Sequence, residues 1–210
     1  MSKRKLVLST GNENKIKEIR HILKDLEIEV LSKKDVNLGN LDVVEDGDTL
    51  EENSLKKAKA LAERIDYMVM ADDTGLFVDA LGGEPGVHAA RYAGEDGNDK
   101  KNNEKLLNSL KGKDLEERKA KFLTVITLIT EDKKTHTVKG ECKGTIALEL
   151  RGPRSFGYDP LFIPEGYDET FAEMGSDIKD KISHRAKAIE NLKNTLMEIL
   201  EDDIDEDSRS

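Results

Sequence analysis

The sequence has little of several residue types, and each shortage excludes a class of protein. A single cysteine, Cys142, excludes a disulfide framework and a cysteine-rich zinc site, and it favours a reducing compartment. There is no tryptophan and only 4% of residues are aromatic, so few side chains could stack on single-stranded nucleic acid. No apolar run approaches the roughly 20 residues of a membrane span. Only Leu6-Val7-Leu8 follows the basic start, which is too short for a signal peptide. We therefore expect a cytoplasmic protein that binds neither nucleic acid nor membrane.

Basic residues are also in deficit, with 34 lysines and arginines against 44 acids and a formal net charge of −10. Six of the acids fall in the last ten residues, where they face only Arg209. Neither this segment nor the rest of the chain offers an overall basic surface for nucleic acid. A polyanionic ligand would therefore need a local basic pocket or a divalent metal.

The apolar pattern alternates between the two periods that distinguish strands from helices. With no internal repeat and no Gly/Ser linker, it predicts a single α/β domain over residues 1–200 and an acidic, disordered tail over residues 201–210. Strands are expected at Leu6–Ser9, Glu27–Ser32, Tyr67–Ala71, Phe122–Ile129 and Thr135–Leu150, and helices over residues 13–24, from Thr49, over residues 103–110 and from Ser183.

The first segment that indicates chemistry is Ser9-Thr10-Gly11-Asn12-Glu13-Asn14-Lys15. A strand that leads through a glycine-containing turn into a helix presents free backbone N–H groups at the positive helix end, and Lys15 would add a full charge. The segment is not a P-loop, because G-x-x-x-x-G-K-[ST] occurs nowhere in the chain. It predicts an anion site, with an ordinary helix start and a solvated lysine as the alternative.

The second segment is Asp72-Asp73-Thr74-Gly75, which follows a buried strand. Acids at the carboxyl end of a strand lie where α/β folds keep their ligand crevices. Two adjacent carboxylates repel each other unless a cation or a proton separates them, and oxygen ligands of this kind suit Mg²⁺. The alternative is a turn in which an aspartate caps the strand end.

Three further segments have weaker signals. Glu45–Glu52 is rich in acids and is either solvated surface or part of a capping box with Thr49. Phe156-Gly157-Tyr158-Asp159-Pro160 combines an aromatic ring with a flexible glycine, and the ring could stack on a base or fill the core. In Lys179–Arg185, Ser183 is a candidate N-cap that places basic side chains against the helix dipole.

Taken together and in order, these segments resemble the non-canonical purine nucleoside triphosphate pyrophosphatases, the inosine/xanthosine triphosphate pyrophosphatase family. The resemblance extends from Leu6 to about Leu196. It is carried by the motifs at Ser9–Lys15, Glu45–Asn53, Ala71–Leu76, Leu81–Gly86, Ala90–Tyr92, Phe156–Pro160 and Ile182–Arg185.

The resemblance implies a long mixed β-sheet with flanking helices that form two lobes around a nucleotide cleft, and it implies a homodimer. It implies hydrolysis between the α and β phosphates of ITP, dITP or XTP, with Mg²⁺ as cofactor. Asp73 is then the general base and a metal ligand, and Lys15 is catalytic. The substrate-binding residues implied are Thr10, Gly11, Asn12, Glu13, Asn14 and Lys15 around the triphosphate, Thr74 as a further substrate contact, and Phe156, Gly157, Tyr158, Asp159, Lys179, His184 and Arg185 around the base and sugar.

The chain departs from the family pattern at two places. Val44-Glu45-Asp46 stands where relatives often have a glutamate pair before the glycine, and we assign Glu45 as the second metal ligand. Arg154-Ser155 stands where many relatives have two glycines, which could stiffen the following loop.

Two other functions stay open from the sequence. A Maf-like pyrophosphatase would share the nucleotide-binding logic, although its early Ser-x-Ser-Pro-Arg-Arg signature is missing here. A non-catalytic nucleotide sensor would have no need of a base such as Asp73. Selection of 6-keto purines can be argued chemically, because donors such as His184 and Arg185 would bond a keto oxygen and stay unpaired against the amino group of adenine.

Overall fold

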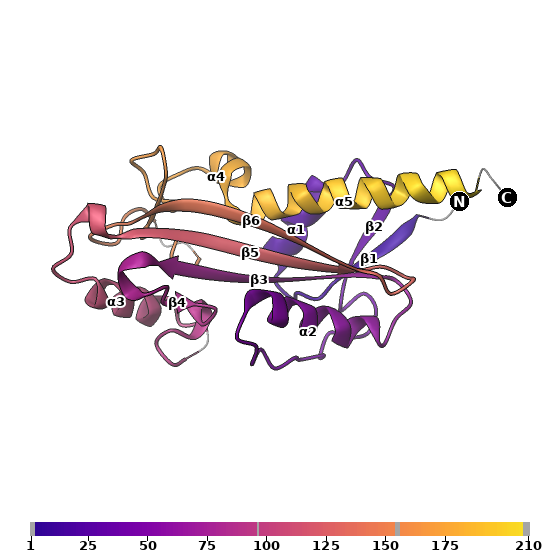
Figure 1. Cartoon of the computed structure of the whole chain (residues 1–210), viewed down its shortest axis with the longest axis horizontal. Helices are drawn as coiled ribbons and strands as arrows, with labels where there is room; N and C mark the ends of the chain where they lie inside the picture. Colours follow the sequence, from indigo (N-terminus) through magenta and orange to yellow (C-terminus); the bar gives the residue numbers. More distant parts are fainter. Residues whose placement is uncertain (1–2, 96, 154–155, 208–210) are drawn as a thin grey trace. The chain divides into compact units, whose positions relative to one another are not determined.

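The computed structural model describes residues 3–95, 97–153 and 156–207, and the side chains of Asn14, Glu18 and residues 202–207 lie outside the described part. The chain forms two compact units (Figure 1). The first comprises residues 1–73, 125–139 and 188–210, and the second comprises residues 74–124 and 140–187. Within the described ranges, no helix is both long and apolar enough to span a membrane.

The described strands pair in the order β2-β1-β3-β5-β6-β7, and β4 lies beside β3. The pairing is mixed, because β1 is parallel to β2 and β3, whereas β3–β4 and β6–β7 are antiparallel. This confirms the expected α/β class with a mixed sheet. The strands are β1 (Arg4–Leu8), β2 (Ile28–Ser32), β3 (Met68–Val78), β4 (Pro85–Gly86), β5 (Lys119–Ile129), β6 (Thr135–Ile146) and β7 (Phe162–Pro164).

The helices comprise five α-helices and three short 3₁₀ turns in the described part of the chain. They are α1 (Glu13–Ile22), α2 (Leu50–Ala62), α3 (Asp99–Ser109), α4 (Ser176–Ile182), α5 (His184–Asp207), η1 (Asp79–Leu81), η2 (Ala89–Arg91) and η3 (Leu115–Glu117).

The first unit has helices on both faces of its strands, and the period-2 alternation of side chains explains why. The register pairs Leu6 with Met68 and Leu8 with Met70, so the same face is apolar on both strands. This face packs against α1 and α5, whereas Val69 and Ala71 face the opposite way and pack against α2. Figure 1 shows α1 and α5 on one side of these strands and α2 on the other. Consecutive residues of β3 therefore face different helices.

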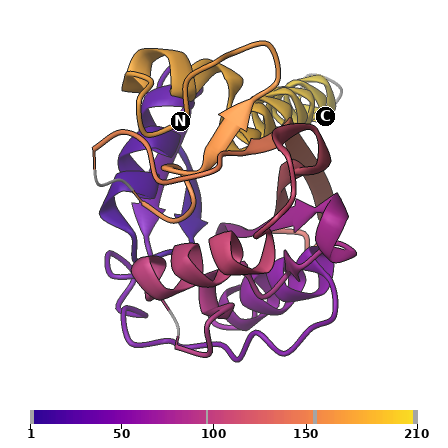
Figure 2. The same ribbon diagram turned by 90° about the vertical axis from the view of Figure 1, so that its left-hand side faces the viewer.

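The second unit is built around a cluster of aromatic side chains. The rings of Phe122 and Phe162 lie 4.7 Å apart, and Phe171 lies 5.1 Å from Phe162. Leu106 and Leu110, at the carboxyl end of α3 and just after it, are buried in the same core. Figure 2 shows α3, in rose, near the viewer.

One expected turn is wrong. A strand was expected to end before Asp72, but β3 continues without a break from Met68 to Val78. The polar residues can stay in the strand because Asp72, Asp73 and Thr74 each have a polar partner on a neighbouring element. Gly75 is needed in this strand for close approach, because a Cβ there would lie 2.7 Å from the carbonyl oxygen of Gly86 on β4.

The carboxyl-terminal third differs from expectation in three ways. α4 and β7 were not expected, since α4 has no buried residue and therefore no apolar period to reveal it. β6 ends at Ile146 rather than Leu150. α5 continues through Asp207, into the tail that was expected to be disordered over residues 201–210, because a formed helix adds residues more easily than it starts. The expected role of Ser183 is confirmed, because its hydroxyl accepts a hydrogen bond from the backbone N–H of Ala186.

Candidate functional site

The turn between β1 and α1 organises the first anion-site candidate. The side chain of Thr10 accepts a hydrogen bond from the backbone N–H of Asn12, and Asn12 Oδ1 accepts one from Lys15, so Asn12 caps α1. These contacts fix the start of α1 at the carboxyl end of β1. The side chain of Lys15, in the first turn, extends to Asp72 with Nζ 2.7 Å from Oδ2. Gly11 and Glu13 lie exposed in the same turn, and the side chain of Asn14 lies outside the described part.

Asp72 and Asp73 are adjacent in sequence but their side chains lie on opposite faces of β3, as the strand period requires. Asp72 lies on the α1 face with Lys15, and Asp73 lies on the α2 face with Lys57. The two carboxylates are therefore not crowded against each other. Each carboxylate has a lysine of its own, supplied by a different helix.

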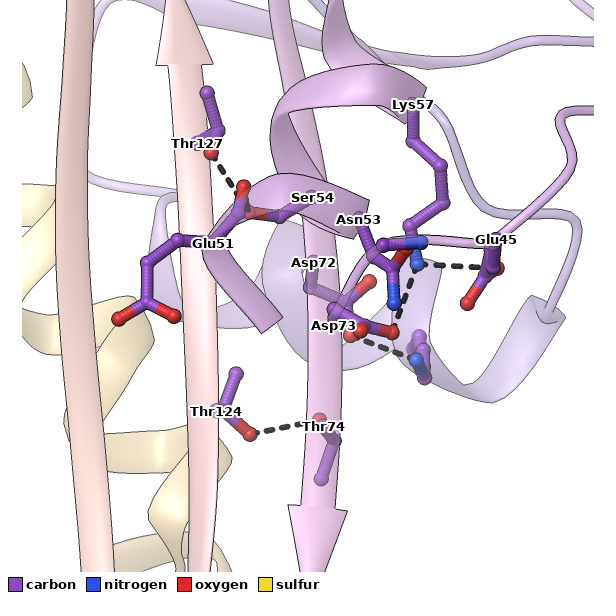
Figure 3. Close-up of polar contacts among 12 residues, drawn as sticks. Glu45, Glu51, Asn53, Ser54, Lys57, Asp72, Asp73, Thr74, Thr124 and Thr127 are labelled. Carbon is purple, nitrogen blue, oxygen red and sulfur yellow. Dashed lines mark hydrogen bonds and ion pairs between the residues drawn. The ribbon is translucent and has the colours of Figure 1, made fainter. Parts of the chain in front are cut away.

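Lys57 is the centre of the α2 face of the site (Figure 3). Its Nζ lies 3.0 Å from Oδ1 of Asp73 and 3.2 Å from Oε1 of Glu45. α2 is held in place one turn earlier, where the buried hydroxyls of Ser54 and Thr127 are 2.8 Å apart. A lysine and two carboxylates thus meet at a fixed position of the first unit.

Burial sets the protonation behaviour of this group. Burial raises the pKa of Asp73 to about 6, against the opposing charge of Lys57. Burial alone would lower the pKa of Lys57, but the charges of Asp73, Asp72 and Glu45 outweigh it and raise the pKa. Oδ2 of Asp73 is buried and has no hydrogen-bond partner among the residues that the structure describes. The site therefore holds a permanent cation beside a carboxylate that can exchange a proton near neutral pH.

The contacts of residues 45–53 explain why this motif has its particular residues. Thr49 caps α2 by accepting the backbone N–H of Glu52, and the carboxylate of Glu52 accepts the backbone N–H of Asp48. In the expected capping box the carboxylate of Glu52 would accept the backbone N–H of Thr49. It accepts the N–H of Asp48 instead, one residue earlier. Asn53 Oδ1 accepts the backbone N–H of Gly47 at 2.8 Å, while its amide points toward Asp73 (Figure 3). The motif folds the acidic segment back onto the start of α2.

Gly47 lets the acidic segment lie directly against Asn53 and Glu52 at the start of α2. A Cβ at Gly47 would lie 2.7 Å from Asn53 Oδ1 and 2.8 Å from the Cβ of Glu52. Gly47→Ala is expected to lower the free energy of unfolding by about 1–3 kcal/mol, because overpacking a buried contact forces its neighbours to move. Urea unfolding would measure the change. In Gly175→Ala the new Cβ meets nothing within 4 Å, so an equal loss there would contradict the steric argument.

Carboxylates at this position suit a divalent cation. Asp73 and Glu45 both lie within 3.2 Å of one lysine nitrogen, and the buried Oδ2 of Asp73 has an unused acceptor. Among the residues described, no group of three or more His, Cys, Asp or Glu side chains could hold a metal by itself. Mg²⁺ is commonly bound by one or two carboxylates and by substrate phosphates. The donor set therefore fits an ion that is completed by a phosphate ligand.

A small cavity of ≈ 90 Å³ lies in the first unit beside the side chains of Lys57 and Glu45. Its lining includes Lys57 and Glu45 from the site and Lys33 from the chain after β2. Two carboxylates, Asp42 and Glu45, lie on the same lining, so this cavity carries equal numbers of acidic and basic side chains and is not by itself the basic pocket that a polyanion would need.

The other expected site residues lie in the second unit. Thr74 shares a hydrogen bond with Thr124, 2.8 Å between their hydroxyl oxygens. Asp159 is buried and forms an ion pair with Lys179. The ring of His184 stacks on Phe122 with centroids 4.5 Å apart, so this histidine is part of the aromatic cluster.

In the same unit, Phe156 is the most exposed of the expected pocket residues, at 64%. Tyr158 is buried and donates a hydrogen bond to the carbonyl of Ala89. Arg185 begins α5 beside His184 and is half-buried. The change at Arg154-Ser155 lies outside the described residues.

Lys57 and Asn53 belong to the site but were not among the site residues expected from the sequence. A signal was present, because the helix from Thr49 places Asn53 and Lys57 four residues apart and therefore on one face. That face could not be connected to Asp73 from the sequence, since nothing in the spacing of residues 57 and 73 shows which strand α2 covers.

The chain is similar to known proteins over most of its length. Residues 6–195 match the Ham1 family. A protein of Clostridium perfringens named dITP/XTP pyrophosphatase is 48% identical over 203 residues, which cover 94% of this chain and 99% of that protein. The Bacillus subtilis protein of the same name is 44% identical over 190 residues, with 90% and 96% covered.

Solved structures agree with this result. The Ham1 protein of Staphylococcus aureus is 39% identical with a TM-score of 0.83, and the match covers 92% of this chain and 98% of that one. A HAM1 protein from Coxiella burnetii is 36% identical with a TM-score of 0.86, covering 93% and 99%.

Proposed function

The chain belongs to the Ham1 family, and we propose that it hydrolyses non-canonical purine nucleoside triphosphates, namely ITP, dITP and XTP, to the monophosphate and pyrophosphate. The relatives named dITP/XTP pyrophosphatase support the substrate class. The observation that carries the proposal is the arrangement of Lys15 on Asp72 and of Lys57 on Asp73 and Glu45. This arrangement offers cations for a polyphosphate and a base for water in one unit.

The phosphate groups are assigned to the turn from Thr10 to Lys15. A helix N-terminus attracts negative charge, and Lys15 places a basic side chain in the first turn of α1. The ion pair with Asp72 holds the ammonium of Lys15 in the site before a substrate arrives. Phosphoryl transfer depends mainly on positioning and charge neutralisation, and a preset lysine supplies both.

Asp73 is assigned as the general base. Its Oδ1 is bound to Lys57, while Oδ2 has no hydrogen-bond partner in the described part and can accept a proton from water. A base works best with a pKa near the operating pH, and the pKa of Asp73 is raised to about 6. Lys57 keeps the carboxylate in one orientation and stabilises its ionised form.

We assign Mg²⁺ as the metal, with Asp73 and Glu45 as its protein ligands. When bound, the ion would neutralise charge on the phosphates. Lys57 contacts both carboxylates and fixes their mutual position without the ion. This assignment agrees with the preference of Mg²⁺ for few protein ligands.

Recognition of the base is assigned to residues of the second unit, namely Phe156–Asp159, Lys179, His184 and Arg185, and Thr74 is assigned as a further substrate contact. Phe156 is exposed enough to stack on a purine. Donors near the 6-keto group of hypoxanthine or xanthine would be left unpaired against the 6-amino group of adenine. His184 packs on Phe122 and is therefore rigidly placed for such a contact.

His184→Ala is expected to relax the preference for ITP over ATP.

The first test is pyrophosphate release from ITP, XTP, ATP and GTP, with and without Mg²⁺. We expect Mg²⁺-dependent release of pyrophosphate from ITP and XTP and much slower release from ATP. Turnover of other nucleotides in preference to these would favour the Maf-like alternative. Binding of ITP without any consumption over a long incubation would favour the sensor. Release of orthophosphate alone would place the cleaved bond elsewhere and overturn the proposal.

The remaining assignments come from the resemblance to the family. We propose a homodimer and a cytoplasmic location, with residues 1–200 as the catalytic domain. The net charge of −10 supports the absence of a nucleic-acid partner. Analytical ultracentrifugation would measure the oligomeric state, and a monomer at micromolar concentration would contradict the dimer.

A further inference from the structure

We propose that Asp99 and Asn103 of α3 are positioning residues for recognition of the base, because together they fix the backbone of Gly157. The inference rests on the proposed function, in which residues 156–159 contact the purine. It assigns a role to α3, which has no part in the chemistry described above. All residues concerned belong to the second unit, in which α3 is the helix near the viewer in Figure 2.

The clamp consists of two hydrogen bonds of opposite polarity. The carboxylate of Asp99 accepts the backbone N–H of Gly157 at 2.9 Å. The amide of Asn103 donates to the carbonyl oxygen of Gly157, also at 2.9 Å. Asp99 and Asn103 are one helical turn apart, so they reach the same stretch of backbone. Both peptide groups that flank the glycine are therefore held.

Gly157 needs such a hold because its own backbone is permissive. Its φ is +62°, in the left-handed region that glycine enters freely but does not prefer strongly. The residue before it, Phe156, is 64% exposed and gets little support from packing. The residue after it, Tyr158, is anchored through its hydroxyl to Ala89. The direction of the Phe156 ring therefore depends on the peptide that Asp99 and Asn103 hold.

Stability alone does not account for Asn103. The residue is 5% exposed, and its Oδ1 is buried with no hydrogen-bond partner in the described part of the chain. A buried acceptor without a partner costs free energy, and asparagine is a weak helix former. An apolar side chain at this position would avoid both costs. An asparagine whose amide instead holds Gly157 indicates a requirement of the site.

The neighbouring residue provides a matched comparison. Asn102 is also buried on α3, but both ends of its amide are bonded, to the carbonyl of Ala90 and to the N–H of Ala93. It holds the segment around η2 and does not touch Gly157. Asn102 therefore represents a buried helix asparagine with a structural role alone.

The experiment measures binding of inosine monophosphate and of inorganic pyrophosphate by calorimetry. Asn103→Asp replaces the donor by an oxygen and is expected to weaken binding of the monophosphate about tenfold, the size of one lost hydrogen bond. Its affinity for pyrophosphate is expected to stay unchanged. The KM for ITP should rise by a similar factor with kcat within about threefold. Asn103→Leu serves as a second variant if the added charge beside Asp99 impairs folding.

Two further variants separate positioning from folding. Asp99→Asn keeps an acceptor for the N–H of Gly157 and is expected to restore the wild-type affinity that Asp99→Ala loses. Asn102→Asp is expected to lower the unfolding midpoint without changing the ratio of the two affinities. Equal weakening of monophosphate and pyrophosphate in the Asn103 variants, or no weakening at all, would overturn the inference. Selective loss of monophosphate binding in a chain that hydrolyses no triphosphate would instead overturn the proposed function and leave the clamp intact.

Discussion

Asp73→Asn is expected to reduce the rate of pyrophosphate release from ITP by about 10²–10⁴-fold, the range that a positioned general base contributes. The amide cannot accept the proton of water at neutral pH, and the substitution removes one of the two charges assigned to the metal. Steady-state kinetics at saturating Mg²⁺ would measure the loss. The fall should appear in kcat, because Lys15 and the start of α1 still bind the phosphates.

The fold of this variant is expected to survive, because Lys57 keeps Glu45 as an ion-pair partner at 3.2 Å. Circular dichroism and the thermal midpoint would check this. Asp66→Asn, which changes a fully exposed carboxylate on the same unit, is the control and should keep the wild-type rate. A rate within tenfold of wild type for Asp73→Asn would remove this residue from the proton transfer.

The parts of the fold that could be predicted are those with an apolar period. α2 has a buried face that repeats at the helix spacing, and β1 ends in a short apolar run that is buried throughout, so the sequence indicated both elements. α4 has no buried residue, so no pattern indicated it. The turn expected at Asp72 failed for another reason. Local preference places paired aspartates and a glycine in turns, whereas lysines from two distant helices allow them to remain in β3.

At the site, contacts between residues close in the sequence could be predicted, whereas contacts between distant residues could not. The capping role of Thr49 depends on residues three positions away and was visible in the sequence. The contact of Lys57 with Asp73 joins residues 16 positions apart and depends on which face of β3 the helix covers. Likewise, the hold of Asn103 on Gly157 spans 54 positions and follows no period. Sequence motifs indicate which residue types are available for chemistry, and tertiary packing determines which of them lie together.

Lys57→Met is expected to lower kcat for ITP by about 10²-fold, which is typical for removal of one preorganised electrostatic group. The buried carboxylate of Asp73 then lies beside Glu45 with no cation between them. Loss of the positive charge removes an influence that lowers the pKa of Asp73, so this pKa should rise above its value of about 6. In the metal-free protein, carbon NMR of the carboxyl groups would follow the titration of Asp73 in both forms.

Lys56 offers a matched control on the same helix. Its Nζ is 2.6 Å from Asp46 on the exposed side of α2, and it does not contact Asp73. Lys56→Met removes the same charge and gains the same side chain, so it should leave both kcat and the titration of Asp73 unchanged. If the two variants lost activity equally, the effect would follow from the net charge of α2. A selective effect at residue 57 would show instead that its contact with two carboxylates is what the reaction requires, since the neighbouring lysine has the same charge but lies on the exposed face of the helix and pairs with Asp46.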